Sequence, residues 1–478
     1  MKVFFETDQN ITAGSLAEMC GGNLLNGGNG LISVRGICTD SREADAQTAF
    51  VALQGERTDG HAYIATAVEN GCRCVICERA VSVKENTAVI VTENSELALS
   101  RLARAYGNTL SCKKIAVTGS VGKTTAKDLI AAVISEYASV YQSKGNHNSV
   151  IGMPLSMLEI APETEYAVLE MGMSGFGEIE RMSLAAQPDI AVITNIGTSH
   201  MEMLGSRENI CRAKLEIVCG LRDGGYLIIN GDEPLLHHVS GKNYRTVSVS
   251  VEHGSADYFA QNIRVESDGT RFDICWNGQT CKDCFIRVLG KHNVYAALYA
   301  FAVGILIGMT PEEIRHGYLR FSPSGMRQNV YSLYGMTVIE DCYNAAPESM
   351  RAAIDVLSEY AKRTNARSVA VLGDMLELGE ESDTLHRMVG AYLAHAGVDL
   401  LVTVGERGLA IAAGAADAGM NPTHIFSHKN RDEIAVIGQI LFEQLQNGDV
   451  VLWKASRSVG LECLISDWKD RIDKKTKT

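Results

Sequence analysis

A short motif around residues 118–125 has the residue types needed to bind phosphate groups. The segment KKIAVTGSVGKTTAKD places two glycines in a turn, follows them with Lys123 and Thr124, and continues into helix-forming residues. Backbone N–H groups at the start of a helix bind phosphate, a lysine neutralises β- and γ-phosphate charge, and a threonine hydroxyl can bind Mg²⁺. The common form of this loop has a glycine at the place of Val117. The motif therefore predicts a nucleotide site with an uncommon loop.

Three further side chains follow apolar runs that have the character of buried strands. Glu170 closes YAVLE, and His200 follows DIAVITNIG, with Lys214 in the helical stretch after it. Taken alone, each has an ordinary structural interpretation: a helix cap or solvated acid, a structural histidine, and a charge on a helix surface. Open α/β sheets bind ligands at the carboxyl ends of their strands. Their common position beside a phosphate loop therefore favours a site for a metal-bound nucleotide.

The later part of the chain adds polar residues at comparable places. His292 and Asn293 stand at a predicted helix start, where they would cap the helix or contact a base. Asp341 follows the apolar run MTVIE, and a turn containing Asn344 comes next. These residues extend the candidate site into a second part of the chain.

The elements that must position these residues alternate between apolar runs and helical stretches. KKIAVTG, YAVLEMG, DIAVITNIG and GYLIING predict a doubly wound, mostly parallel sheet, and the region 243–290 is more typical of hairpins. MTVIED, RSVAVLGD, DLLVTVGE and DVVLWKAS predict a second α/β series, and FSPSGM marks its beginning. We therefore expect an α/β protein of three domains: a small α/β domain over residues 1–110, a central domain with a P-loop-type sheet over 111–321, and a Rossmann-like domain over 322–478.

Composition narrows the functional classes. The 478 residues suffice for about three domains of roughly 150 residues. The net charge of −13 argues against a broad nucleic-acid surface. No apolar run of 18 residues occurs, and MKVFFETDQN lacks the pattern of a signal peptide. The thirteen cysteines include a single CxxC, at Cys281 and Cys284, so reduced thiols in a cytoplasmic protein are expected rather than a zinc site.

Taken in order, the motifs resemble the Mur ligases of peptidoglycan synthesis over nearly the whole chain. The resemblance rests on TGSVGKTT, EMG after the second strand, NIGTSH, AKLE, HN at 292–293 and DCYN at 341–344. The uncommon phosphate loop is normal in that family. TDSREADAQTAFVALQGERTDGHAYI looks like the UDP-sugar-binding domain, and LGDMLELGEESDTLH and DCYNAAPESM look like the member that adds D-alanyl-D-alanine to UDP-N-acetylmuramoyl-tripeptide. The resemblance implies ATP-dependent ligation through an acyl phosphate, in the cytoplasm, by a monomer that binds neither nucleic acid nor membrane.

The resemblance also implies residue roles. Lys123, His200 and Lys214 would be catalytic. ATP would be bound by Thr118, Gly119, Ser120, Val121, Gly122, Lys123, Thr124, Thr125, His292, Asn293, Arg327, Asp341 and Lys454. Two Mg²⁺ ions would be held by Thr124, Glu170, His200 and Lys214. The substrates would contact Ser41, Arg42, Asn146, Asn148 and Asn344. In the family, the lysine at the place of Lys214 carries a carbamate derived from CO₂. The carbamate supplies the oxygen ligand that Mg²⁺ prefers.

Some features leave alternatives open. Ala296, Ala346 and Ala455 replace residues that are usual in the family. His386 is a candidate base for the incoming amine, although its helical surroundings favour a structural role. The alternatives are the related ligase that adds L-lysine or meso-diaminopimelate as third residue, a non-catalytic nucleotide-binding relative, and an unrelated P-loop ATPase.

Overall fold

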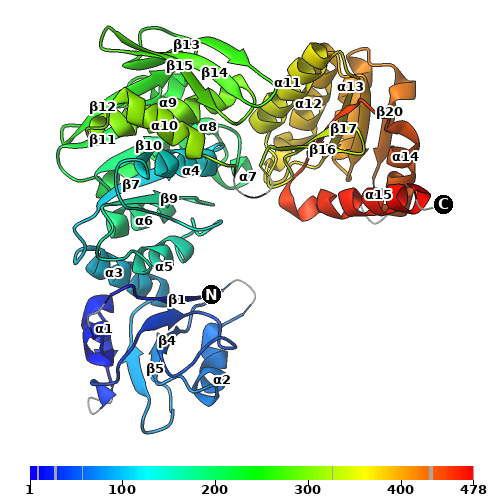
Figure 1. Ribbon diagram of the computed structural model, residues 1–478. Coiled ribbons are helices and arrows are strands. Elements are labelled where there is room, and N and C mark those ends of the chain that lie inside the picture. Colours follow the sequence, from blue (N-terminus) through cyan, green and yellow to red (C-terminus); the bar gives the residue numbers. More distant parts are fainter. Residues whose placement is uncertain are drawn as a thin grey trace.

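Three β-sheets, each covered by helices, follow one another along the chain in this computed structural model (Figure 1). The structure describes residues 1–7, 10–25, 29–55, 58–323, 325, 327–429 and 434–476. The N-terminal part lies at one end, the central part adjoins it, and the C-terminal part lies to one side of the central part. The protein is thus a three-domain α/β protein, and the boundaries near residues 110 and 322 remain our proposal.

The N-terminal sheet is mixed and mostly parallel. Its strand order is β1-β3-β4-β5-β6-β2, and the edge strands β1 and β2 pair antiparallel with β3 and β6. The strands are β1 (Lys2–Phe4), β2 (Asn23–Leu24), β3 (Gly36–Cys38), β4 (Thr48–Val51), β5 (Cys74–Cys77) and β6 (Ala88–Val91). The helices are α1 (Ala13–Cys20), α2 (Ile64–Glu69) and α3 (Ser95–Gly107).

The central sheet has the strands predicted from the apolar runs. Its order is β15-β14-β13-β12-β11-β10-β7-β9-β8, parallel from β8 to β13 and closed by an antiparallel meander over β13, β14 and β15. The strands are β7 (Lys113–Thr118), β8 (Val140–Gln142), β9 (Tyr166–Glu170), β10 (Ile190–Ile193), β11 (Gly225–Asn230), β12 (Tyr244–Ser250), β13 (Tyr258–Val265), β14 (Thr270–Trp276) and β15 (Gln279–Ile286). Since β9 and β10 are buried on both faces, they have continuous apolar sequences.

Helices cover both faces of this central sheet. They are α4 (Lys123–Ile134), α5 (Gly152–Leu158), α6 (Glu178–Ala186), α7 (Met201–Leu204), α8 (Arg207–Leu215), α9 (Val294–Leu306) and α10 (Pro311–Arg320). Helix α4 begins directly after the phosphate loop and packs against α9, which is apolar all round and buried. An apolar helix of this kind belongs in a core, so the phosphate loop rests on a rigid base.

The C-terminal sheet also confirms the predicted strands. Its order is β16-β17-β21-β18-β19-β20, with only the β16–β17 pair antiparallel. The strands are β16 (Asn329–Leu333), β17 (Met336–Glu340), β18 (Ser368–Gly373), β19 (Leu400–Val404), β20 (Ile425–His428) and β21 (Val450–Lys454). The helices are α11 (Pro347–Thr364), α12 (Ser382–Ala396), α13 (Gly408–Asp417), α14 (Ile434–Gln444) and α15 (Leu461–Thr476).

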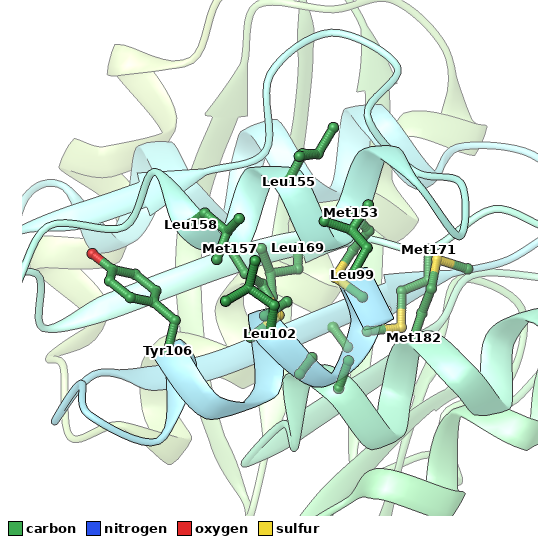
Figure 2. Close-up of a cluster of buried hydrophobic side chains, with 14 of the residues drawn as sticks. Leu99, Leu102, Tyr106, Met153, Leu155, Met157, Leu158, Leu169, Met171 and Met182 are labelled. Atoms are coloured by element: carbon green, nitrogen blue, oxygen red, sulfur yellow. The ribbon is translucent and has the colours of Figure 1, made fainter. Parts of the chain in front are cut away.

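Helix α3 joins the first two parts of the molecule through a shared hydrophobic core (Figure 2). Leu99 and Leu102 of α3 lie among side chains of α5, β9 and α6, and the hydroxyl of Tyr106 donates to the carbonyl oxygen of Ile160 at 2.8 Å. The same core continues into the N-terminal sheet through residues such as Leu16. The first two sheets are therefore packed together rather than loosely tethered.

No helix in the described part of the chain is long and apolar enough to cross a membrane.

Candidate active site

The predicted site residues of the central part meet at one edge of its sheet. Strands β7, β9 and β10 are neighbours, and their register pairs Thr118 with Ile193 and Val117 with Glu170. All three strands therefore end at the same level, and the segments that follow them share one edge. This is the place where open α/β sheets bind ligands.

The phosphate loop occupies residues 119–122, between β7 and α4. A side chain is impossible at Gly119, because a Cβ there would lie 1.8 Å from Oγ1 of Thr194. The ammonium of Lys123 donates to the carbonyl oxygens of Gly119 at 2.9 Å and Ser120 at 3.3 Å. The loop is thus closed on itself, with its lysine at the start of a twelve-residue helix, as a phosphate-binding turn requires.

Asn195 holds this loop from the neighbouring strand. Its side-chain oxygen accepts hydrogen bonds from the N–H groups of Ser120 at 3.1 Å and Val121 at 2.9 Å. Asn195 is the first residue of the motif NIGTSH, which by itself indicated no role for it. The structure shows it as a direct contact of the loop backbone.

Glu170 provides a buried carboxylate beside the first turn of α4. Its Oε2 accepts from the hydroxyl of Thr124 at 2.7 Å, and its Oε1 accepts from the side-chain amide of Asn148 at 2.8 Å. The ammonium of Lys127 lies 3.9 Å from Oε2. A hydroxyl and a carboxylate next to a phosphate loop are the hard oxygen donors that Mg²⁺ prefers, so these residues fit that ion.

His200 follows β10 and lines the same cleft. It adopts a left-handed backbone conformation, with φ of 66°, and its Nδ1 lies 2.7 Å from Oε2 of Glu377 in the C-terminal part. The hydrogen bond from His200 lowers the pKa of the Glu377 carboxyl. A metal-binding histidine is usually oriented by such a carboxylate.

Lys214 is buried, contrary to what its position in a helix suggested when taken alone. Its side chain on α8 is 1% exposed, and its ammonium has no hydrogen bond or ion pair within the described ranges. Burial, reinforced by the charge of Lys123, brings its pKa well below the usual lysine value. A neutral amine is therefore favoured here. An ammonium could not bind a metal ion, so Lys214 fits a Mg²⁺ site only after chemical modification.

The C-terminal part contributes the opposite wall. Lys454, at the end of β21, is 2% exposed, and its ammonium lies 2.5 Å from Oδ2 of Asp341 and 3.1 Å from the carbonyl oxygen of Asn344. The guanidinium of Arg327 stacks 3.7 Å from the ring centroid of Tyr343. This wall therefore carries two cations held in fixed positions.

One cleft of about 400 Å³ brings most of the predicted residues together. Those that line it are Ser120, Val121, Gly122, Lys123, Thr124, Thr125, Asn146, Asn148, Glu170, His200, His292, Asn293, Arg327, Asp341, Asn344 and Lys454. Thr118, Gly119 and Lys214 lie outside its lining, the first with its hydroxyl donating to the carbonyl oxygen of Met171. The cleft also includes Ser174, Glu178 and Gln328, which the sequence motifs did not single out, and Tyr343 and Ser349, which lie within DCYNAAPESM but had no predicted role.

Ser41 and Arg42 lie elsewhere, in the N-terminal part. The carbonyl oxygen of Ser41 accepts from Asn70, and Arg42 pairs with Asp40 at 2.5 Å on the surface. The structure does not bring them to the cleft that contains the phosphate loop. Their predicted contact with a uridine nucleotide stays a prediction.

His386 has both ring nitrogens engaged. Its Nδ1 lies 2.6 Å from the carbonyl oxygen of Ser382, and its Nε2 accepts from the N–H of Met375 at 2.9 Å. The ring is fully buried, and burial lowers its pKa. His386 therefore orders the turn after β18, in agreement with the structural interpretation, and has no free nitrogen to act as a base.

Three family models match successive parts of the chain. The model described as "Mur ligase family, catalytic domain" matches residues 33–107, "Mur ligase middle domain" matches 117–304, and "Mur ligase, glutamate ligase domain" matches 326–457.

Individual relatives match over nearly the full length. The UDP-N-acetylmuramoyl-tripeptide–D-alanyl-D-alanine ligase of Bacillus subtilis is 40% identical over 467 residues, which cover 95% of this chain and 98% of the relative. A crystal structure of MurF from Acinetobacter baumannii has a TM-score of 0.86 at 31% identity and covers 97% of this chain and 99% of that one. A MurF ligase from Thermotoga maritima in complex with ADP has a TM-score of 0.82 at 27% identity and covers 92% of this chain and 98% of that one.

Proposed function

Because this chain belongs to the Mur ligase family, we propose that it joins D-alanyl-D-alanine to UDP-N-acetylmuramoyl-tripeptide with ATP, in peptidoglycan precursor synthesis. The observation that carries the proposal is the cleft between the central and C-terminal parts. It combines the phosphate loop and Glu170 on one wall with Asp341 and Lys454 on the other. Relatives named for this reaction match almost the whole chain.

The reaction needs activation of a carboxylate, since a carboxylate does not acylate an amine unaided in water. The terminal carboxylate of the tripeptide attacks the γ-phosphorus of ATP, and ADP leaves, so that an acyl phosphate forms. The amine of D-alanyl-D-alanine then attacks the acyl carbon, loses a proton, and expels inorganic phosphate. Both steps concentrate negative charge, and preorganised cations lower the energy of such transition states.

The residues of the central wall would bind the phosphates. Lys123 is held at the loop and would neutralise the β- and γ-phosphate oxygens, while Thr124 and Glu170 would hold Mg²⁺ next to them. A second Mg²⁺ would be held by His200 and modified Lys214. The metal ions supply charge neutralisation at the transferring phosphoryl group.

Lys214 is proposed to carry a carbamate. A neutral amine attacks CO₂, forms an N–C bond, and releases a proton, which gives a carboxylate-like group. The strongly lowered pKa of Lys214 supports the first requirement, because it favours the neutral amine. The product would provide the oxygen donors that the unmodified side chain lacks.

The remaining residues would position the substrates. His292, Asn293 and Arg327 would contact the nucleotide, and Asp341 and Lys454 would approach it from the C-terminal wall. The substrates would contact Ser41, Arg42, Asn146, Asn148 and Asn344. We further propose a cytoplasmic monomer without nucleic-acid or membrane partners.

A phosphate-release assay tests the proposal. We expect release only when ATP, Mg²⁺, D-alanyl-D-alanine and a UDP-N-acetylmuramoyl-tripeptide are all present, with tripeptides ending in L-lysine and in meso-diaminopimelate supplied separately. Release with a UDP-N-acetylmuramoyl-dipeptide and L-lysine or meso-diaminopimelate would instead identify the ligase that adds the third residue. No release with any combination would favour a non-catalytic relative.

Lys123→Ala serves as the matched control in that assay. It removes the phosphate-neutralising cation, so product formation should be lost while the protein stays folded. Retained turnover would exclude the loop from the reaction.

A further inference from the structure

We propose that two carboxylates of the C-terminal part, Glu348 and Glu377, are positioning residues that set the loop of His200, so that this metal-binding residue is correctly oriented only when the C-terminal part is docked. The inference rests on the proposed function, because it assigns His200 to a Mg²⁺ site. It gives a role to two residues that lie within the family-like segments DCYNAAPESM and LGDMLELGEESDTLH, for which the motifs themselves indicated none. Figure 1 shows α7, which follows this loop, on the side of the central part that faces the C-terminal part.

The loop over residues 196–200 is anchored to the phosphate loop on its central side. The guanidinium of Arg207 donates to the carbonyl oxygen of Ile196 at 2.7 Å, and the N–H of Gly197 donates to the hydroxyl of Ser120 at 2.9 Å. A displacement of residues 196–200 would therefore be transmitted to the phosphate-binding turn.

Glu348 holds the middle of this loop from the first turn of α11. Its carboxylate accepts from the N–H of Thr198 at 3.1 Å and from the hydroxyl of the same residue at 3.2 Å. The approach is so close that a Cβ at Gly197 would lie 3.0 Å from the carboxylate. Hydrogen bonds to a charged acceptor are stronger than neutral ones, so Glu348 fixes the loop backbone across the junction.

Glu377 holds the imidazole itself. Both His200 and Glu377 have left-handed backbones, with φ of 66° and 63°, and the N–H of Glu202 also donates to the carbonyl oxygen of Glu377 at 3.3 Å. Such conformations are strained and persist where the surroundings determine them. Two strained residues therefore meet at the junction, at a contact that orients a predicted metal ligand.

The hydrogen bond to Glu377 decides which ring nitrogen of the neutral imidazole carries the proton. A carboxylate accepts, so the proton lies on Nδ1 and the lone pair on Nε2, which is the form that binds a metal ion. Nε2 has no hydrogen bond among the residues that the structure describes, and His200 lines the cleft. Because the Glu377 side chain is 59% exposed, this hydrogen bond adds little stability to the folded protein. The contact with Glu377 therefore acts by orienting the imidazole of His200.

The first test uses the metal-free, nucleotide-free protein with ¹⁵N-labelled histidine, with the His200 signal assigned by its loss in His200→Gln. In the wild type at pH 8 we expect a single tautomer with the proton on Nδ1. Glu377→Ala should give a mixture of tautomers, and Glu380→Ala, which removes an exposed glutamate of the same turn, should leave the spectrum unchanged. An identical His200 signal in wild type and Glu377→Ala would overturn the proposal.

The second test uses the kinetics of ligation. Glu377→Ala should reduce kcat about 10–100-fold and change the KM values less than about twofold, and Glu377→Gln should recover part of the loss because its amide oxygen still accepts. The inference is wrong if Glu377→Ala and Glu380→Ala have the same kcat. If the wild type shows no ligation at all, the proposed function fails, whereas the nuclear magnetic resonance test still decides the role of Glu377.

The third test addresses Glu348 by hydrogen exchange. Glu348→Ala should increase amide exchange of residues 196–202 at least about tenfold, since the N–H of Thr198 loses its acceptor and the loop loses its anchor. Glu359→Ala, an exposed glutamate on the same helix, serves as the control. Unchanged exchange in Glu348→Ala would show that Glu348 does not hold the loop.

Discussion

Lys214 of the central part and Lys454 of the C-terminal part are both almost fully buried, yet their surroundings are opposite. Lys454 contacts the carboxylate of Asp341 and the carbonyl oxygen of Asn344, whereas Lys214 has no hydrogen-bond or ion-pair partner in the described chain. Burying an unpaired charge is costly, and the neutral form is then favoured. The C-terminal wall of the cleft thus keeps a compensated cation, whereas the central part keeps, outside the lining of the cleft, a lysine whose neutral form is favoured.

The largest effect is expected from removing the amine. Lys214→Met should reduce ligation roughly 10³-fold, because the proposed carbamate that holds a metal ion cannot form. Turnover is measured by phosphate release after CO₂ has been removed and bicarbonate restored, and the wild type should recover activity with bicarbonate while the variant should not. A wild type that is indifferent to bicarbonate, together with an active variant, would contradict the carbamate.

The next largest effect is expected from replacing Lys454, the lysine that is paired with Asp341. Lys454→Met should lower the free energy of unfolding by about 2 kcal/mol, because Asp341 then keeps its charge without a partner. Asp341 is 21% exposed, so we expect a loss smaller than the usual one for fully buried pairs. Thermal and urea unfolding measure the change, and adding Asp341→Leu should restore part of the loss. Additive losses in the double variant would mean that the two residues do not interact.

Replacing the unpaired Lys214 should have the opposite effect on the stability of the protein. Lys214→Met should raise the free energy of unfolding by roughly 1–2 kcal/mol at pH 7 in CO₂-free buffer, because an apolar side chain replaces an unpaired amine. The pKa of Lys214 is lower in the folded state, so the unfolded chain binds more protons between that pKa and 10.5, and the stability of the wild type rises with pH in this window. The difference between the proteins should therefore shrink from pH 7 to pH 9.5 in urea titrations. A variant less stable than the wild type at pH 7 would contradict this.

The smallest effect is expected from replacing His386, which we compare with His200. His386→Leu should lower the free energy of unfolding by about 1–2 kcal/mol, because it removes both hydrogen bonds of the turn after β18. Ligation, measured at a temperature where the variant is folded, should stay within about twofold, unlike the loss expected for His200→Gln. A large loss of kcat in folded His386→Leu would return His386 to the list of catalytic candidates.

Local patterns were sufficient to predict four strands of the nine-stranded central sheet and four of the six-stranded C-terminal sheet. The apolar runs that became β7, β9, β10 and β11 are continuous because their strands are buried on both faces, and helices separate them. The phosphate loop could be found because its glycines, Lys123 and Thr124 are consecutive in the chain. Glu170 and His200 were placed correctly because each follows a strand that ends at the same edge.

Other features could not be predicted because they depend on segments far apart in the sequence. Helix α3 belongs to a hydrophobic core that two sheets share, because α5 and α6 pack against it. The composition of α3 alone does not indicate this shared core. Glu348 meets Thr198 across 150 positions of sequence, and Glu377 reaches His200 from a turn whose own residues do not indicate a partner.

By itself, the sequence predicted which residues would carry the chemistry: local patterns indicated the loop with Lys123 and the strand-end acid Glu170, and the order of motifs that resembles the Mur ligases added His200 and Lys214. Only the tertiary structure decided the state of those residues. The pKa of Lys214 is lowered because packing removed water from its side chain and supplied no acceptor. His200 acquired an orientation because a second part of the molecule brought a carboxylate to it. Charge and proton position depend on the surroundings of a side chain, and folding alone creates those surroundings.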